Sequence, residues 1–344
     1  MFWKALFLSS GYRVLMMGLE HAVSYWIAAP GQGELRREPL PSPAADEVIV
    51  QTLFSGVSRG TESLVFGGRV PSSEFQRMRA PFQDGEFPAP VKYGYSNVGR
   101  VVSGPAALRD ALVFCLYPHQ TRYIVPAVAV QVLPEGVPPA RAILAASMET
   151  ALNGVWDAEL RAGDRVSVIG AGSIGLLVAW LASRMPGCDV QLVDNNPARA
   201  TIARHLGLPF ALPDAARGDA DVVIHASSTQ EGLNTALGLA GYEASVTELS
   251  WYGDRSVSLS LGGAFHSRRL VLRSSQVGAV AAAQRPRWTH GRRLALALTL
   301  LREPLLDALV NSEGRFENLP TDMPRLAQAG SDVILHRVVY GSQN

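Results

Sequence analysis

The sequence predicts an α/β protein in which a β-rich front region is followed by a doubly wound parallel sheet. Short runs of β-branched and aromatic residues, separated by turn residues, occupy residues 22–132, as in a compact β-rich domain. From residue 164 onward, apolar runs of strand length alternate with stretches of helix length. That alternation indicates βαβ units, whose parallel strands are buried on both faces. A chain of 344 residues suffices for two domains.

The front region is expected to contain short strands and one long helix. Pro39, Pro41 and Pro43 indicate a loop between the first two strands. Residues 140–157 have the composition of a helix and lead into the second region. The predicted strands cover residues 22–29, 47–54, 97–102, 111–116 and 122–132.

The second region is expected to form a parallel sheet and then return to the front region. Its predicted strands cover 166–170, 190–194, 221–227, 244–249 and 270–276, with helices over 173–185 and 197–206. A helix should follow residue 291. The last strand, 333–340, is β-branched like the front region, so we expect it to join that region. The predicted domains are therefore 1–157, completed by 292–344, and 158–291.

Charge and cysteine content exclude several classes of protein. The net charge is +1, so no nucleic acid or membrane partner is expected. The only two cysteines, Cys115 and Cys188, exclude a disulfide framework and a multi-cysteine zinc site, and predict a cytoplasmic protein. Residues 1–16 lack the features of a signal peptide and are predicted to be a start-site extension.

The stretch VSVIGAGSIG, residues 166–175, has the pattern of a dinucleotide-binding turn. Gly170 is expected to make the tight turn, Gly172 to admit a pyrophosphate and Gly175 to let the helix pack on the strand. Ser173 and Ile174 begin that helix, whose N-terminal N–H groups favour phosphate. The pattern lies between a predicted strand and a predicted helix, as the Rossmann fingerprint requires.

Asp194 ends the next predicted strand, 19 residues after Gly175. A carboxylate there accepts hydrogen bonds from ribose hydroxyls and disfavours a 2′-phosphate, so NAD is predicted and NADP stays possible. Arg199 is interpreted as a helix-surface arginine, although it could also favour NADP. The remaining predicted cofactor contacts are Asn195, Ala226 of the segment 225–228, and Ser250 of the segment 250–253.

The order of these elements resembles the medium-chain dehydrogenase/reductase superfamily over residues 20–340. The resemblance implies a GroES-like domain, a Rossmann domain and a homodimer. Three segments resemble the family's zinc-binding landmarks, but their residues differ. Ser58 and Arg59 stand at the expected cysteine, Tyr95 at the histidine and Ser96 at the glutamate that follows it. One remaining carboxylate, Glu149, does not make a zinc site, so a zinc-free member is predicted.

The stretch GVSRGTESLVFGGRVP, residues 56–71, resembles the bacteriochlorophyllide a dehydrogenase branch and its relatives of unassigned function. The reaction of that branch is NAD-linked oxidation of a hydroxyethyl group to an acetyl group. The resemblance therefore implies a dehydrogenase of alcohol/ketone pairs, without specifying a substrate.

Without zinc, other groups must stabilise the substrate oxygen and move one proton. Thr61 matches a family position that relays a proton, and Tyr95 is either a donor or a space-filling aromatic. Glu149 could act as a base, or pin Tyr95 or Arg59. His119, in a loop that borders the cleft in relatives, is a further acid or base candidate. Arg337 stands near a position that contacts pyrophosphate in the family.

The prediction is a zinc-independent, NAD(H)-dependent oxidoreductase of alcohol/ketone pairs that acts on a small-molecule substrate. Two alternatives remain: an NADPH-dependent reductase of conjugated C=C bonds, and a dinucleotide-binding protein without activity. Arg59 and Lys92 could neutralise an anionic substrate. The segment 71–90 is expected to shape the pocket, where its phenylalanines either face a ring or merely pack.

Overall fold

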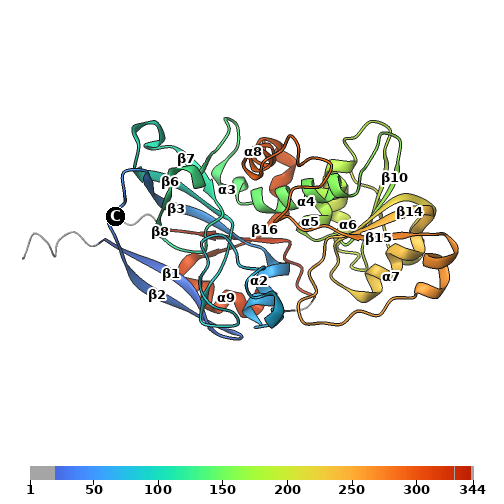
Figure 1. Cartoon of the computed structure of the whole chain (residues 1–344), viewed down its shortest axis with the longest axis horizontal. Coiled ribbons are helices and arrows are strands. Elements are labelled where there is room, and N and C mark those ends of the chain that lie inside the picture. The colour runs from blue at the N-terminus through green and yellow to red at the C-terminus, as the bar shows by residue number, and fades with distance from the viewer. Residues whose placement is uncertain (1–19, 329, 342–344) are drawn as a thin grey trace, which may run out of the picture.

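The computed structural model describes residues 20–328 and 330–341. The predicted start-site extension, residues 1–16, lies outside the described residues. Figure 1 shows two lobes along the longest axis of the chain, a β-rich lobe at one end and a parallel-sheet lobe at the other. Within the described ranges, no helix is long and apolar enough to cross a membrane.

A small antiparallel sheet begins the β-rich lobe. Its strand order is β2–β1–β5–β4, and β1 and β2 form a hairpin around Gly31, whose φ is +77°. Pro39 lies in β2, so the loop predicted there begins later. Because β2 is an edge strand, it tolerates a residue without an N–H. The strands are β1 (Glu20–Ala29), β2 (Gln32–Leu40), β4 (Asp84–Gly85) and β5 (Val91–Lys92).

A seven-stranded sheet forms the rest of this lobe. The order is β16–β17–β3–β6–β7–β9, with β8 paired to β3. The C-terminal strand β17 pairs antiparallel with β3, with His336 opposite Val57. The predicted limits of the two domains, at residues 157 and 291, stay predictions. The strands are β3 (Glu47–Val57), β6 (Asn97–Ser103), β7 (Leu112–Cys115), β8 (Arg122–Pro126), β9 (Gln131–Val132), β16 (Val310–Arg315) and β17 (Leu335–Val339).

The second lobe is built on a parallel sheet of six strands, which confirms the predicted α/β class. The order β12–β11–β10–β13–β14–β15 places β10 at the centre, and all five strand pairs are parallel. The strands are β10 (Arg165–Ile169), β11 (Asp189–Val193), β12 (Phe210–Ala211), β13 (Ala220–His225), β14 (Ala240–Glu248) and β15 (Val271–Ser274).

The helices differ in detail from the sequence prediction. The helix predicted over 140–157 is two helices, interrupted at Ile143 and Leu144, and the strand predicted over 122–132 breaks after Pro126, which ends β8. The helices are α2 (Arg59–Phe66), α3 (Pro139–Ala142), α4 (Ala145–Asp157), α5 (Ser173–Ala182), α6 (Arg199–His205), α7 (Gln230–Leu239), α8 (His290–Leu300) and α9 (Leu319–Leu326).

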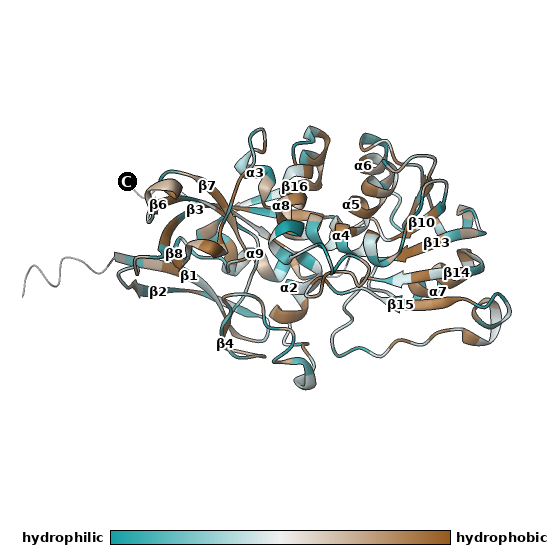
Figure 2. Cartoon of the chain, turned by 45° about the horizontal axis from the view of Figure 1, so that its top comes forward, coloured by the Kyte–Doolittle hydropathy of each residue, from teal (hydrophilic) through white to brown (hydrophobic). Residues whose placement is uncertain are grey.

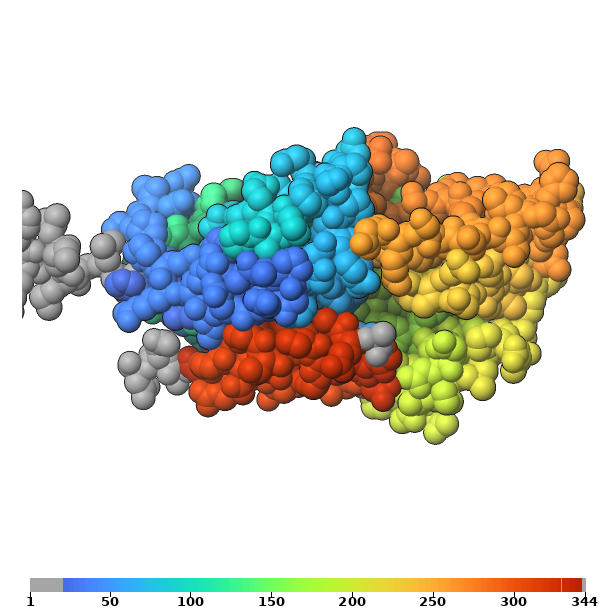
Figure 3. All heavy atoms as spheres, turned by 90° about the horizontal axis from the view of Figure 1, so that it is seen from below, coloured from blue at the N-terminus to red at the C-terminus, as the bar shows by residue number. Residues whose placement is uncertain are grey.

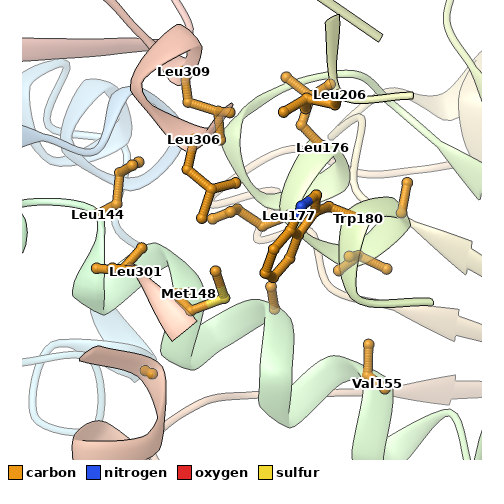
Figure 4. Packing of buried hydrophobic residues seen from close by; sticks show 14 of the residues in the cluster. Leu144, Met148, Val155, Leu176, Leu177, Trp180, Leu206, Leu301, Leu306 and Leu309 are labelled. Carbon is orange, nitrogen blue, oxygen red and sulfur yellow. The ribbon is translucent and has the colours of Figure 1, made fainter. Parts of the chain in front are cut away.

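The largest hydrophobic cluster joins the two lobes. Met148 of α4, Leu177 of α5 and Leu298 of α8 are buried in it, together with Val98 of β6. Figure 4 shows Met148 and Leu177 among the labelled side chains of this cluster, and Figure 2 shows the hydrophobic colour of α5. A continuous core across the junction holds the carboxyl ends of the parallel strands in a defined position against the β-rich lobe.

Candidate functional site

The glycine turn after β10 has the geometry of a dinucleotide cradle. Gly170 has a φ of +104°, and a Cβ there would lie 2.7 Å from the backbone nitrogen of Ser227. A Cβ on Gly175 would overlap the carbonyl oxygen of Gly170, so α5 packs directly on the turn. A Cβ on Gly172 would meet no atom within 4 Å. This open space at the N-terminus of α5 fits a pyrophosphate, which needs close backbone approach and free N–H groups.

Asp194 follows β11 and is fixed beside the same turn. Its Oδ2 accepts a hydrogen bond from the Ala171 N–H at 2.6 Å, and its Oδ1 accepts one from the Asn196 N–H at 2.8 Å. The carboxylate therefore lies where an adenosine ribose would approach a Rossmann cradle. The other residues predicted for this part of the site are exposed or half-buried: Ser173, Ile174 and Asn195.

A hydrogen-bonded group around His225 lies at the carboxyl ends of β13 and β14. His225 Nδ1 lies 2.7 Å from Glu248 Oε2, and Nε2 lies 2.6 Å from Ser227 Oγ. Burial raises the pKa of Glu248, but hydrogen bonds and charge from His225, with hydrogen bonds from Ser250, outweigh it and hold that pKa below its ordinary value. Because an ionised carboxylate only accepts, the Nδ1–H of His225 donates to Glu248.

This Ser–His–Glu group joins the carboxyl end of β13 to that of β14 and to the start of α7. Ser227 Oγ also lies 2.9 Å from Thr229 Oγ1, and Thr229 caps α7. His225 has no exposed surface. The predicted residue Ser250 accepts the Ser228 N–H at 3.0 Å. The predicted residue Ala226 also faces the turn, since its Cβ would lie 3.7 Å from a Cβ built on Gly175.

Tyr95 and the first turns of α2 form the other side of the candidate site. Tyr95 is half-buried, and its hydroxyl shares hydrogen bonds with the Ser58 and Thr61 side chains. Burial, followed by the charge of Glu62, raises the pKa of Tyr95 to about 12, although those two hydrogen bonds act in the opposite direction. The ring lies edge-on to Tyr93, with centroids 5.9 Å apart. Of the predicted catalytic residues, the structure brings Tyr95 and Thr61 together.

The loop after β14 brings the parallel-sheet lobe against this side. Asp254 N–H donates to the Arg69 carbonyl at 3.1 Å, and Gly253, with a φ of +65°, packs beside Leu64. Trp251 packs against the same hydrophobic cluster as Tyr95. Figure 3 shows the corresponding surface, where N-terminal segments meet segments from the region near residue 260. The Tyr95 side of the site and the cradle therefore belong to lobes that are in direct contact.

His119 is enclosed, although a histidine bordering an open cleft was predicted. Its exposed fraction is 1%. Nε2 lies 2.8 Å from Glu62 Oε2, and Nδ1 lies 2.7 Å from Ser55 Oγ. Glu62 was not predicted as part of the site, although it is the acidic residue of the Gly-Thr-Glu segment and follows Ser58 by one helical turn. A residue this enclosed has no direct contact with a substrate.

The predicted pyrophosphate contact, Arg337, is engaged elsewhere. Its guanidinium pairs with Glu313 on the neighbouring strand. Two other arginines converge on the segment 331–333: Arg59 donates to the carbonyls of Ser331 and Val333, and Arg199 to that of Asp332. Burial, and then the nearby charge of Arg199, lower the pKa of Arg59. The Arg59 guanidinium, predicted to neutralise a substrate, is therefore engaged in hydrogen bonds to backbone carbonyls.

The segment 71–90 mainly packs on itself and on its neighbours. Phe87 is buried and contacts Phe75 at a centroid distance of 5.7 Å, while the exposed Phe82 lies 5.5 Å from Tyr117. Lys92, predicted to neutralise a substrate, is buried and pairs with Glu38 and Asp84. The packing interpretation of the phenylalanines is therefore the better one for Phe75 and Phe87.

Comparisons with known proteins associate this architecture with dehydrogenases. No protein-family model matches the sequence. The chain is 26% identical over 310 residues to D-guloside 3-dehydrogenase of Escherichia coli (strain K12), covering 80% of this chain and 87% of that protein. A protein described as a zinc-binding dehydrogenase, from Sinorhizobium meliloti 1021 and bound to NADP, has a TM-score of 0.73 at 18% identity, covering 93% and 99% of the two chains. An alcohol dehydrogenase from Escherichia coli CFT073 complexed with NADH has a TM-score of 0.72 at 16% identity, covering 93% and 99%.

In sequence and fold, the chain is similar to these dehydrogenases. Its two lobes are accordingly a GroES-like domain and a Rossmann domain.

The residues that stand at the predicted zinc-binding landmarks form a donor set that does not fit a zinc ion. Among residues 20–328 and 330–341, no three histidine, cysteine or acidic side chains form a group that could hold a metal. Ser58 and Tyr95 hydrogen-bond to each other, and Ser96 donates to the Ile143 carbonyl. Hydroxyls engaged in this way are not the nitrogen, sulfur and carboxylate ligands that zinc takes.

Glu149, the remaining candidate at that position, has a different partner from those predicted. Arg293 Nε donates to Glu149 Oε1 at 3.0 Å, and both side chains are buried. Burial raises the pKa of Glu149, while the charge and hydrogen bond of Arg293 lower it. Arg293 comes from α8, 144 residues along the chain. The pair joins α4 to α8, so Glu149 pins neither Tyr95 nor Arg59.

Proposed function

We propose that the chain is a zinc-independent oxidoreductase that transfers hydride between NAD(H) and an alcohol/ketone pair. One arrangement carries the proposal: the Tyr95 hydroxyl, held by Ser58 and Thr61, lies where the Rossmann domain packs through Trp251. The relatives bound to NADP and NADH support a nicotinamide cofactor. The resemblance to the bacteriochlorophyllide a dehydrogenase branch stays a prediction.

In the proposed reaction, a bound nicotinamide cofactor supplies or accepts the hydride. The turn at Gly170 and the N-terminus of α5 bind the pyrophosphate. Tyr95 donates a hydrogen bond to the substrate oxygen and holds the proton that this oxygen gains or loses. Thr61 and Ser58 orient the Tyr95 hydroxyl. A preorganised phenol thus provides the stabilisation that a metal provides in zinc-dependent relatives.

NAD is the proposed cofactor because both oxygens of Asp194 are fixed beside the cradle. A 2′-phosphate would approach this carboxylate and be repelled. The nearest candidate to bind such a phosphate, Arg199, donates instead to the carbonyls of Ser331 and Asp332.

We also infer that two copies pair through their Rossmann sheets. All four residues of the edge strand β15 are exposed. An uncovered edge strand is a template for pairing with another chain.

Tyr95→Phe tests the proposed function, with Tyr93→Phe as the matched control. Activity is measured on a panel of secondary alcohols and ketones that includes D-gulosides, and NADH affinity by nicotinamide fluorescence. Tyr95→Phe should lower kcat/KM by about a hundredfold or more, the usual contribution of a positioned proton donor. NADH affinity should not change.

An unchanged rate in Tyr95→Phe would remove Tyr95 from the mechanism. Tight NADH binding without turnover on any substrate would favour the non-catalytic alternative. A preference for NADPH would favour the C=C reductase.

A further inference from the structure

Two arginines meet on one carbonyl in the segment that leads into β17. Arg59 donates to the carbonyls of Ser331 and Val333. Arg199 donates to the carbonyl of Ser331 at 3.3 Å and to that of Asp332 at 2.8 Å. Arg59 begins α2 of the GroES-like domain, and Arg199 begins α6 of the Rossmann domain. The Ser331 carbonyl therefore joins guanidiniums from both domains.

The same segment contacts the residue next to the predicted ribose carboxylate. The Asn196 N–H donates to Asp194 Oδ1 at 2.8 Å, and the Asn196 side chain donates to Asp332 Oδ1 at 2.9 Å. In Figure 3 the yellow-green region near residue 200 meets the red C-terminal region. Asn196 thus binds two carboxylates, one from each domain. Asp332 is separated by this one residue from the carboxylate that the proposed function assigns to NAD.

Asp332 is the carboxylate that compensates the two guanidiniums. Backbone carbonyls are neutral, and within residues 20–328 and 330–341 neither Arg59 nor Arg199 forms an ion pair. Both arginines hold the segment that carries Asp332. Burial and then the charge of Arg199 lower the pKa of Arg59, and the charge of Asp332 opposes them. Together with Asp194, the group contains two carboxylates and two guanidiniums.

Both guanidiniums keep unused N–H donors. A guanidinium has five N–H donors, but Arg59 donates only from Nη1, and Arg199 makes one bond from each of Nη1 and Nη2. A guanidinium binds phosphate oxygens in pairs, so converging arginines with free donors suit a phosphate. Without a carboxylate beside them, Arg59 and Arg199 would favour the 2′-phosphate of NADP.

We propose that Asp332 of the GroES-like domain is a determinant of cofactor specificity, which keeps Arg59 and Arg199 from serving as a 2′-phosphate site. Its carboxylate compensates both guanidiniums and adds a second negative charge to that of Asp194. Specificity of this kind works by repelling the unwanted ligand. The inference rests on the proposed function and extends it, because the preference for NAD, assigned there to the Rossmann domain, becomes a property of both domains.

Binding of NADH and of NADPH to the full chain, followed by nicotinamide fluorescence, tests the inference. Asp332→Asn removes the charge and leaves an amide oxygen that can accept from Asn196. The ratio of NADPH affinity to NADH affinity should rise about tenfold, the usual effect of one charge-assisted hydrogen bond. NADH affinity should change much less, because NADH has no 2′-phosphate. The gain should shrink with added salt, which screens exposed charges.

Further variants show whether the effect acts through the arginines. Arg199→Met, added to Asp332→Asn, should return the affinity ratio to nearly the wild-type value. Glu313→Gln is the matched control, since it removes one negative charge from the same domain, and Glu313 pairs with Arg337 instead. Its affinity ratio should equal that of the wild type. Asp332 is exposed, so neither Asp332→Asn nor the alternative Asp332→Ser disturbs the core.

An unchanged affinity ratio in Asp332→Asn, with tight NADH binding, would overturn the inference and leave the proposed function standing. An equal rise in Glu313→Gln, or a rise that persists after Arg199→Met is added, would also overturn it. A raised ratio together with a fully active Tyr95→Phe would instead overturn the proposed donor and leave the role of Asp332 standing. A wild type that binds NADPH more tightly than NADH would overturn both the NAD assignment and the inference.

Discussion

Replacing Arg293 with Met should destabilise the protein by several kcal/mol. Arg293 is 1% exposed and donates to Glu149 Oε1, to Asn153 Oδ1 and to the carbonyls of Val277 and Ala279. The substitution leaves Glu149, which is 5% exposed, without its cation. Breaking a buried ion pair by removing one partner costs about 3–5 kcal/mol. We expect that loss in the free energy of unfolding near neutral pH.

The loss should shrink as pH falls. Burial raises the pKa of Glu149 and Arg293 opposes that effect, so removing Arg293 raises this pKa further. A carboxyl whose folded pKa exceeds its unfolded value contributes stability that is fully present below the unfolded value, about 4.3, and is lost as pH rises from there through the folded pKa. Arg293→Met should therefore approach the wild type in stability toward pH 4.

Urea unfolding of a double-mutant cycle provides the assay. Glu149→Met and Arg293→Met are compared with the double variant, whose loss should be smaller than the sum of the single losses because no charge is left unpaired. Arg273→Met is the control, since the ion pair of Arg273 with Glu159 is largely exposed and worth less than about 1 kcal/mol. Additive losses, or an Arg293→Met loss as small as the control, would refute the reasoning.

Three further predictions follow from the site and its supports. Gly175→Ala should weaken NADH binding about tenfold or more, because the added Cβ would overlap the Gly170 carbonyl oxygen. Gly238→Ala is the control, since a Cβ there has open space and NADH should bind normally. Equal NADH affinities of the two variants in a fluorescence titration would contradict the close packing. Asp194→Ser should shift the NADPH-to-NADH affinity ratio toward NADPH about tenfold, and an unchanged ratio would separate Asp194 from the ribose. Burial lowers the pKa of His336 from 6.5 to about 4, so the wild type should lose roughly 3 kcal/mol of stability as pH falls between these two values. His336→Gln should lose less stability over the same pH range. Urea unfolding at the two ends of that range measures both losses, and equal losses would contradict the prediction.

Local patterns predicted most of the fold because strands and turns leave a short-range signal. The run at 166–170 corresponds to β10 (Arg165–Ile169), and the glycine turn begins where this strand ends. The prediction was wrong where a proline altered the pairing of a strand. Pro39 was tolerated on an edge, while Pro126 ended β8 because it cannot donate to a ladder.

The cofactor side of the site was predictable for the same reason. Gly170, Gly172 and Gly175 act on backbone within a few residues of themselves, and Asp194 reaches the same turn from the adjacent strand. Spacing along the chain therefore carries nearly all the information needed to recognise the cradle.

The proton-handling side was only partly predictable, because its partners are distant in sequence. Glu62 pairs with His119, which lies 57 positions away, and Glu149 pairs with Arg293, which lies 144 positions away. Both candidate bases could be named from residue type and resemblance. Whether each faced a cleft or a buried counter-charge depended on which elements packed beside it.

The sequence by itself determined that this protein has a β-rich domain, a parallel-sheet domain and a glycine cradle, since periodicity and turn chemistry act over short distances. Only the tertiary structure decided which side chains are free to act. In the folded chain, His119 is enclosed against Glu62, Glu149 pairs with Arg293, and Tyr95 lies half-buried beside Thr61. The physical reason is that burial and charge pairing are properties of contacts between distant segments, and those contacts exist only once the chain has folded.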